Sequence, residues 1–114
     1  MHELGIVFHI IDSLEKVGKE NLLHTVSNVT LEIGEVTGVI DSYLHDCWRW
    51  AADKSELLRG SKLIIERIPA VTVCEDCCKT YGTVQYGKAC PFCLGTNTYL
   101  VTGNEFNIKE IEAC

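Results

Sequence analysis

The stretch Cys74-Glu-Asp-Cys77, followed after twelve residues by Cys90-Pro-Phe-Cys93, is the part of this sequence that decides the fold. A Cys-x-x-Cys turn directs two thiolates at one point, and two such turns supply the four sulfur ligands of a tetrahedral Zn²⁺ site. We therefore predict a structural zinc ribbon with Cys74, Cys77, Cys90 and Cys93 as its ligands. A cage of four thiolates leaves no coordination position open, so this site alone does not identify the function.

Other uses of the same cysteines stay open at this stage. Iron in a rubredoxin-like electron carrier takes the same four ligands, and Cys-x-x-Cys pairs also form disulfides or redox dithiols. Cys78 directly follows Cys77, so a pairing of Cys74 with Cys78 also lies within the usual spacing of about two to four intervening residues. We assign Cys77 because it gives both pairs the same spacing, which leaves Cys78 as a spare thiol at the rim.

Strand patterns flank this ribbon on both sides. Residues 62–68 (Lys-Leu-Ile-Ile-Glu-Arg-Ile) are predicted to form a strand, and Pro69 marks its end or a bulge. Residues 103–111 alternate Phe106 and Ile108 with polar side chains, which predicts a further strand. The ribbon, from about residue 72 to 99, is therefore predicted to be an insertion between two strands. The expected domains are a discontinuous α+β domain of residues 1–71 and 100–114, and a zinc-ribbon domain of residues 72–99.

The earlier part of the chain predicts two helices and one further strand. Residues 4–18 have the apolar spacing of a helix that buries one face, formed by Leu4, Val7, Phe8, Ile11, Leu14 and Val17, and Gly18 is expected to end it. Residues 25–34 alternate as a half-buried strand. A second helix is expected from a cap at Asp41 or Ser42 to about Lys54. The predicted fold is α+β, with two helices on a small, mainly antiparallel sheet and an inserted four-cysteine zinc-ribbon lobe.

Composition excludes several classes of function. The 114-residue chain has a formal charge of −6, which argues against a nucleic-acid partner because phosphate binding depends on clustered Lys and Arg. No stretch approaches about eighteen consecutive apolar residues, so we expect no membrane span. Seven cysteines is an odd number, and no secretory leader pattern opens the sequence, so a cytoplasmic protein is expected.

The sequence starts Met1-His2-Glu3 and enters the first predicted helix almost at once. An α-amine, backbone amide nitrogens and an imidazole within two residues form adjoining chelate rings, and Ni²⁺ or Cu²⁺ prefers such nitrogen donors in a plane. Glu3 has two interpretations. Its carboxylate would offset the positive field of the helix N-terminus around a bound metal, or it would cap the first helical turn.

Several motifs in this order resemble the HypA/HybF family of hydrogenase-maturation nickel metallochaperones. They are the N-terminal Met-His-Glu, Leu-Glu-Ile-Gly-Glu at 31–35, the two cysteine pairs, Gly-Asn-Glu at 103–105 and Ile-Glu at 111–112. The resemblance spans almost the whole chain. It implies a metal carrier, not an enzyme, that binds one transferred Ni²⁺ through His2, the Met1 amine and Glu3. It also implies structural Zn²⁺ on the four cysteines.

The same resemblance implies the partners. They are a nickel-handling GTPase of the hydrogenase maturation pathway and the precursor of the large subunit of a nickel–iron hydrogenase, with urease as a further recipient in some organisms. The chain would act as a monomer or a homodimer. Two other functions remain open: a rubredoxin-like electron carrier, and a zinc-ribbon interaction module in which Met-His-Glu has no nickel role.

Overall fold

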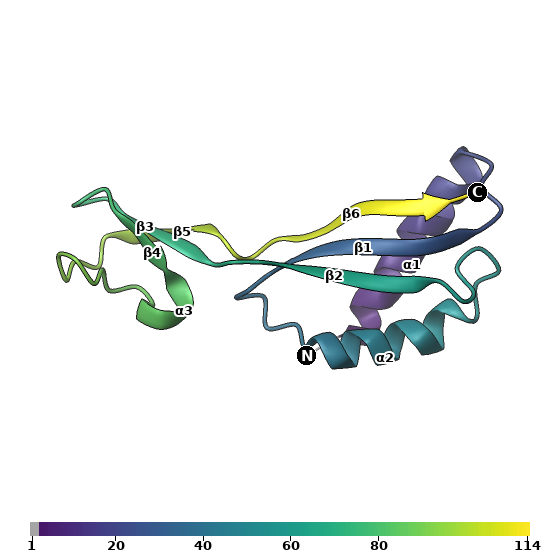
Figure 1. The fold of residues 1–114 in the computed structure, drawn as a ribbon, viewed down its shortest axis with the longest axis horizontal. Helices are drawn as coiled ribbons and strands as arrows, with labels where there is room; N and C mark the ends of the chain where they lie inside the picture. Colours follow the sequence, from purple (N-terminus) through teal and green to yellow (C-terminus); the bar gives the residue numbers. More distant parts are fainter. Residues whose placement is uncertain (1–2) are drawn as a thin grey trace. The chain divides into compact units, whose positions relative to one another are not determined.

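The computed structural model describes residues 3–114, which form two compact units. Unit 1 contains the described residues up to Leu31, Val39–Glu66 and Asn107–Cys114, and unit 2 contains Glu32–Gly38 and Arg67–Phe106. The elements in Figure 1 are α1 (Glu3–Glu20), β1 (Val26–Gly34), α2 (Asp41–Ala52), β2 (Lys62–Ile68), β3 (Val71–Cys74), β4 (Thr80–Gly82), α3 (Thr83–Tyr86), β5 (Thr98–Thr102) and β6 (Phe106–Ala113).

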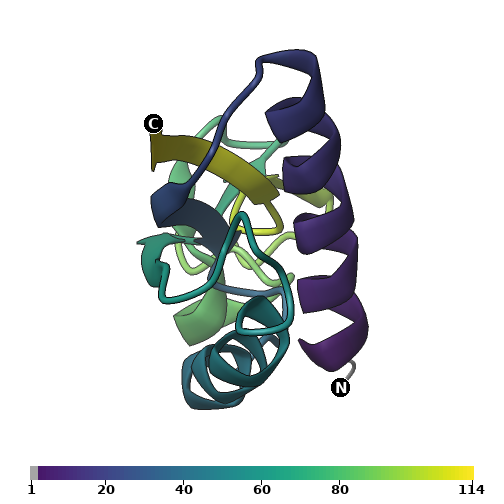
Figure 2. The ribbon, with the colours of Figure 1, turned by 90° about the vertical axis from the view of Figure 1, so that its right-hand side faces the viewer.

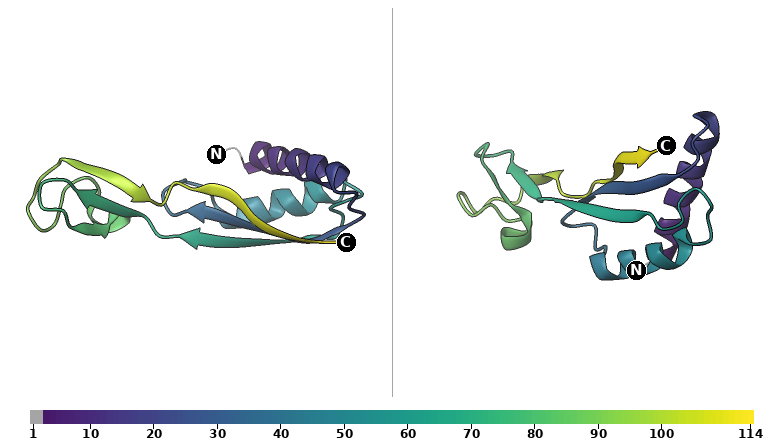
Figure 3. Two further views of the ribbon diagram at one scale, coloured as in Figure 1. Left: turned by 90° about the horizontal axis from the view of Figure 1, so that it is seen from above. Right: turned by 45° about the vertical axis from the view of Figure 1, so that its right-hand side comes forward.

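One three-stranded sheet has the order β2-β1-β6. The N–H of Cys114 donates to the Thr25 carbonyl, and the N–H of Gly34 donates to the Glu105 carbonyl. The start of β1 therefore lies beside the end of β6, so the two strands are antiparallel. The arrows of β1 and β2 point the same way in Figure 3, so this pair is parallel. Two parallel strands need a crossover connection that returns the chain to the other end of the sheet, and this connection contains α2.

Both long helices lie on one face of this sheet within unit 1, as the left view of Figure 3 shows. Figure 2 shows α2 almost end-on beside the upright α1. The helices and strands of the unit bury a common set of apolar side chains, which includes Val7, Ile10, Ile11, Leu14, Val29, Leu31, Leu44, Trp48, Leu58 and Leu63. The predicted α+β class, with two helices on a sheet and a four-cysteine lobe, is confirmed.

The buried face of α1 is narrower than predicted. Leu4, Phe8 and Val17 are 41%, 42% and 38% exposed, whereas Ile10, which the prediction left out, is buried. The buried positions follow the i, i+3, i+4, i+7 spacing that places side chains on a single helix face. Phe8 lies beside that face, and its ring meets the ring of Trp50 on α2 edge-on at a centroid distance of 6.2 Å.

Gly18 does not end α1, contrary to the prediction. The helix continues to Glu20, and the chain turns where Leu22 adopts a positive φ of 56°. Gly18 is instead a packing position, because a Cβ atom there would lie 2.8 Å from a methyl group of Leu57. The glycine therefore lets the segment after α2 approach α1 closely.

The start of α2 also differs from the prediction. Asp41 is the first helical residue and Ile40 occupies the cap position, with no side-chain cap of its own. The N–H of Ile40 donates to the Glu3 carboxylate at 3.3 Å, so an acceptor from α1 takes the place of a local cap. This bond connects the first turn of α1 to the start of α2.

Unit 2 has a second antiparallel sheet, of order β4-β3-β5, that the sequence pattern did not reveal. Thr72 pairs with Tyr81 on β4, and Val73 pairs with Tyr99 on β5. The buried centre of this unit consists of Cys74, Tyr81 and Cys90. Two of its three members are cysteines that also belong to the candidate metal site.

Close backbone contacts hold the two segments of unit 2 together next to the strand ends. A Cβ atom on Gly34 would overlap the backbone of Gly103, which has a φ of 118°. The Glu35 carboxylate accepts a hydrogen bond from the Ala70 N–H at 2.8 Å, and the Glu105 carboxylate accepts one from the Gly103 N–H at 2.7 Å. These contacts explain why β6 starts only at Phe106, later than the predicted strand at residue 103.

Candidate metal centre

Two copies of one backbone turn present the cysteine pairs. The N–H of Cys78 donates to the Cys74 carbonyl at 2.8 Å, and the N–H of Leu94 donates to the Cys90 carbonyl at the same distance. Cys78 and Leu94 have positive φ angles of 62° and 63°. A left-handed residue directly after each pair is therefore part of the turn that places both thiols.

A second bond closes each turn. The N–H of Cys74 donates to the Lys79 carbonyl, and the N–H of Cys90 donates to the Gly95 carbonyl, each at 2.9 Å. Gly95 has a further role, because a Cβ atom there would lie only 3.2 Å from the Cys93 sulfur. The sequence analysis did not single out Gly95; its place two residues after Cys93 is the signal that would have identified it.

The four thiols converge at one point. All four Sγ atoms lie within 4.8 Å of one another, with Cys74 and Cys93 3.5 Å apart and Cys77 and Cys90 3.6 Å apart. Tetrahedral zinc with Zn–S bonds of about 2.3 Å places sulfurs about 3.8 Å apart, whereas a disulfide needs about 2.05 Å. All seven cysteines are free, so the donor set fits a metal ion and not a disulfide.

Burial of the four ligands is graded. Cys74 and Cys90 are buried, Cys77 is half-buried and Cys93 is exposed. Cys78 is exposed and lies outside the cluster, where its Sγ is 4.0 Å from the Glu75 carbonyl. The structure thus brings together the four cysteines that the spacing selected and leaves Cys78 at the rim.

The thiols of the cluster have different proton affinities in the absence of metal. Burial raises the pKa of Cys90, but hydrogen bonds from the backbone N–H groups of Cys93 and Phe92 and from neighbouring thiols outweigh it, and lower that pKa to about 7. A thiolate at Cys90 is thus stabilised by donors around it. Cys77 is one of these donors, so the surroundings favour a negative sulfur at Cys90.

Cys93 shows the opposite behaviour. The Gly95 N–H lowers its pKa, but the neighbouring thiol of Cys74, burial, and the other two cysteines together raise that pKa to about 12. The pKa of Cys77 is also raised: the Lys79 N–H lowers it, but burial and the thiols of Cys90 and Cys74 outweigh that bond. A metal ion that enters this site must therefore displace protons from Cys77 and Cys93.

The predicted nickel ligands Met1 and His2 lie outside the described residues. Glu3 is described, and it is 5% exposed at the start of α1 with its Oε2 atom bonded to the Ile40 N–H. Within residues 3–114, the cysteine cluster is the group of three or more potential ligands that lie close enough to share an ion. The structure therefore places Glu3 but leaves the N-terminal site as a prediction.

Comparison with known proteins identifies a family. The model of the family described as "Hydrogenase/urease nickel incorporation, metallochaperone, hypA" matches residues 1–113. "Hydrogenase maturation factor HypA" of Geobacter metallireducens is 34% identical over 113 residues, which is 98% of each chain. The protein of the same name from Dehalococcoides mccartyi is 32% identical over 112 residues, 98% of this chain and 93% of that one.

A solved structure has the same fold. The solution structure of the Ni metallochaperone HypA from Helicobacter pylori matches with a TM-score of 0.72 at 24% sequence identity. The match covers 99% of this chain and 97% of that chain. The fold of this chain is therefore one already known from experiment.

Proposed function

Because this chain belongs to the HypA family of hydrogenase and urease nickel-incorporation metallochaperones, we propose that it binds one Ni²⁺ through Met1, His2 and Glu3 and delivers it to an immature hydrogenase. Members of such a family carry a metal and are not enzymes. The recipient in this proposal is the large-subunit precursor of a nickel–iron hydrogenase, and urease is a second possible recipient.

The position of Glu3 is the observation that supports the nickel site. Its carboxylate is buried next to His2 in the sequence and accepts one hydrogen bond from the Ile40 N–H. A carboxylate has about four lone-pair positions, so this bond leaves capacity for a metal ion. The negative charge also offsets the positive N-terminal ends of α1 and α2, which otherwise repel a cation. Glu3 is thus suited to fix one side of a site that His2 and the Met1 amine complete.

The cysteine cluster has a different role in this proposal. Its sulfur distances and donor set fit Zn²⁺, which would hold the core of unit 2 together through Cys74, Cys77, Cys90 and Cys93. A closed thiolate cage retains its ion, whereas a terminal site with few ligands can release one. We therefore divide the functions between a zinc ribbon at residues 72–99 and a nickel-binding domain at residues 1–71 and 100–114.

Transfer of nickel requires partners. The proposal includes a nickel-handling GTPase of the maturation pathway and the hydrogenase precursor, and it places the protein in the cytoplasm as a monomer or homodimer. Among the described residues, no helix has the length and apolar character to cross a membrane. The charge of −6 gives no support to a nucleic-acid partner.

A nickel titration of variants tests the proposal. His2→Ala should abolish high-affinity Ni²⁺ binding, and the matched variant His9→Ala, which changes an exposed histidine on α1, should leave it unchanged. Nickel affinity should also fall as the pH drops through about 6.5, because the imidazole must be neutral to bind the metal. Equal affinity of the His2→Ala and wild-type proteins would refute the assignment.

One rival function needs a separate test. A rubredoxin-like electron carrier would hold iron on the same four cysteines. Metal analysis and the absorption spectrum of freshly purified protein separate the two, because an oxidised iron–thiolate centre is red and a zinc centre is colourless. A zinc content of one ion per protein molecule supports the metallochaperone assignment.

A further inference from the structure

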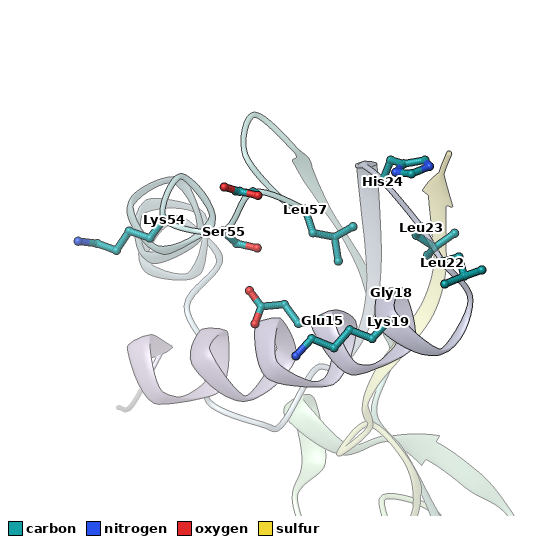
Figure 4. Close-up of a pocket in the computed structure, with 10 residues that line it drawn as sticks. Glu15, Gly18, Lys19, Leu22, Leu23, His24, Lys54, Ser55 and Leu57 are labelled. Atoms are coloured by element: carbon teal, nitrogen blue, oxygen red, sulfur yellow. The ribbon is translucent and has the colours of Figure 1, made fainter.

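A cleft in unit 1 has no part in the proposed nickel or zinc chemistry. It has a volume of about 720 Å³ and lies between the last turns of α1, the turn that follows α1 and the segment after α2 (Figure 4). This volume is within the range of about 300 to 1,000 Å³ that is usual for small-ligand sites. Its apolar wall includes Leu22, Leu23 and Leu57, and its polar wall includes Glu15, Lys19 and Ser55.

Ser55 is the observation that indicates a ligand. The residue is only 6% exposed, and its hydroxyl oxygen is buried with no hydrogen-bond partner among the described residues. Figure 4 shows this hydroxyl directed into the cleft, across from the Glu15 carboxylate. A buried hydroxyl without a partner destabilises the protein, so a hydrogen-bonding group that enters the cleft would recover this free energy.

The electrostatics of the cleft favour a cation. Glu15 is half-buried, and its carboxylate forms no ion pair or side-chain hydrogen bond with another residue in the range 3–114. Lys54 also lines the cleft, but its ammonium lies 4.2 Å from the centre of the Trp50 ring, on the side away from the cleft in Figure 4. Lys19 contributes one positive charge, and Glu56 contributes a second carboxylate.

The two long helices add to this negative field. α1 ends at Glu20 and α2 ends at Ala52, and cleft residues lie within the last turn of α1 and just beyond the end of α2. A helix carries partial negative charge at its C-terminal end, which stabilises cations nearby. The cleft therefore combines two carboxylates and two helix C-termini, which outweigh the Lys19 ammonium.

A metal ion does not fit this cleft. In the described part of the chain, the four cysteines are the group of ligands close enough to hold an ion, and His24, Glu15 and Glu56 do not form one. The apolar wall is also unsuited to a hydrated ion. Leu57 is the apolar residue between Ser55 and α1, and Leu22, which is 82% exposed, lines the far end of the cleft.

We propose that this cleft binds an organic cation, an ammonium or guanidinium group on an apolar stem. Glu15 accepts hydrogen bonds from the cationic head, Ser55 gains its missing partner, and Leu22 and Leu57 contact the stem. Such a group occurs both in small amines and in the Arg or Lys side chain of a protein segment. The inference is independent of nickel binding, because none of the cleft residues belongs to the proposed metal sites.

Amide chemical-shift mapping of the full-length, zinc-loaded protein tests this site. The probes are n-butylguanidine, as a free cation, and the peptide acetyl-Leu-Arg-Leu-amide, as a protein-like source; pentanoate is the anionic control of similar length. We expect saturable shifts at Gly18, Leu23, Ser55 and Leu57 with a cationic probe and not with pentanoate. Tighter binding of the peptide would indicate that the cation comes from a side chain of a protein segment. Tighter binding of n-butylguanidine would indicate that it is a free small molecule.

Two variants and a matched control decide whether the cleft residues cause the binding. Glu15→Gln should weaken the better probe about tenfold or more, since it removes a charge-assisted hydrogen bond worth about 1.5–3 kcal/mol. Glu20→Gln, which neutralises an exposed carboxylate at the end of the same helix, should have little effect. Ser55→Ala should weaken binding about fivefold without lowering the unfolding temperature, because the hydroxyl has no partner in the free protein.

Three results would overturn the proposal. They are the absence of localised shifts with both cations, equal shifts with pentanoate, and equal weakening by Glu15→Gln and Glu20→Gln. A Ser55→Ala protein that binds the probe normally but unfolds at lower temperature would also overturn it, because the hydroxyl would then have a structural role and not a role in binding. None of these outcomes affects the nickel titration. Failure of the cleft proposal can therefore be distinguished from failure of the proposed nickel site.

Discussion

Cys78 and Leu94 are equivalent residues in two copies of the same turn. Each directly follows the second cysteine of its pair, has a φ close to 62°, and donates its N–H to the carbonyl of the first cysteine at 2.8 Å. This backbone conformation leaves both side chains exposed and outside the thiol cluster. The turn, and not the identity of the side chain, therefore excludes Cys78 from the metal site.

Serine variants of two adjacent cysteines should distinguish the zinc ligand Cys77 from Cys78, which lies outside the cluster. Cys78→Ser should retain one zinc per protein, because Cys78 contributes its backbone and not its sulfur. Cys77→Ser should lose zinc and destabilise unit 2, since metal binding and folding are coupled in such sites. Metal analysis and thermal unfolding measure both effects. Loss of zinc from Cys78→Ser would contradict the assignment.

Gly34→Ala should destabilise the protein by about 2–3 kcal/mol or more. The new Cβ atom would overlap the Gly103 backbone, which is bonded on both sides and has no flexible end that can move aside. Gly82→Ala is the matched control in the same unit, because its Cβ would meet nothing within 4 Å and its φ of −72° suits alanine. Denaturant unfolding gives both free energies, and equal values would contradict this account of the contact.

Zinc binding should release protons from Cys77 and Cys93 at about pH 7.5, since the pKa of each is raised. Affinity should therefore fall as the pH is lowered. The dependence should steepen below about pH 7, where Cys90 also becomes protonated. Calorimetric titrations of zinc-free protein in buffers of different ionisation enthalpy measure the released protons. A binding enthalpy that does not depend on the buffer would contradict the raised pKa values.

Two variants of Glu3 should separate its structural contact from its proposed metal contact. Glu3→Gln keeps an oxygen that accepts the Ile40 N–H, so the stability should change little while nickel affinity falls. Glu3→Ala leaves that N–H without its partner and should cost about 1–3 kcal/mol of stability as well. Thermal unfolding and nickel titration of both proteins check this. Unchanged nickel affinity in Glu3→Gln would remove Glu3 from the ligand set.

The sequence predicted two of the strands almost to the residue. The strand expected at 25–34 is observed as Val26–Gly34, and the strand expected at 62–68 has the same bounds in the structure. Helix ends were less predictable. Gly18 has the residue type of a helix stop, but it is buried against Leu57, and the termination at Leu22 has no glycine to mark it. Tertiary packing therefore explains why Gly18 lies inside the helix and not after its end.

The cysteine cluster was predictable because a ligand set and its spacing are local properties of the chain. The sheet around it was not, because β3, β4 and β5 are three to five residues long and too short for a clear alternation. The buried contact of Glu3 with Ile40 joins residues 37 positions apart, which no local pattern encodes. For the same reason, the cleft at Ser55 emerged only from the structure.

The central claim is that nickel binds at the N-terminus with the Met1 amine as a ligand. The most direct test is a nickel titration of two zinc-loaded proteins, one that starts at Met1 and one with a single glycine added before Met1. The added residue leaves every side chain unchanged but displaces the amine from its chelate ring. The account predicts loss of high-affinity Ni²⁺ binding in the extended protein, with zinc content and unfolding temperature unchanged. Equal nickel affinity in the two proteins would contradict it.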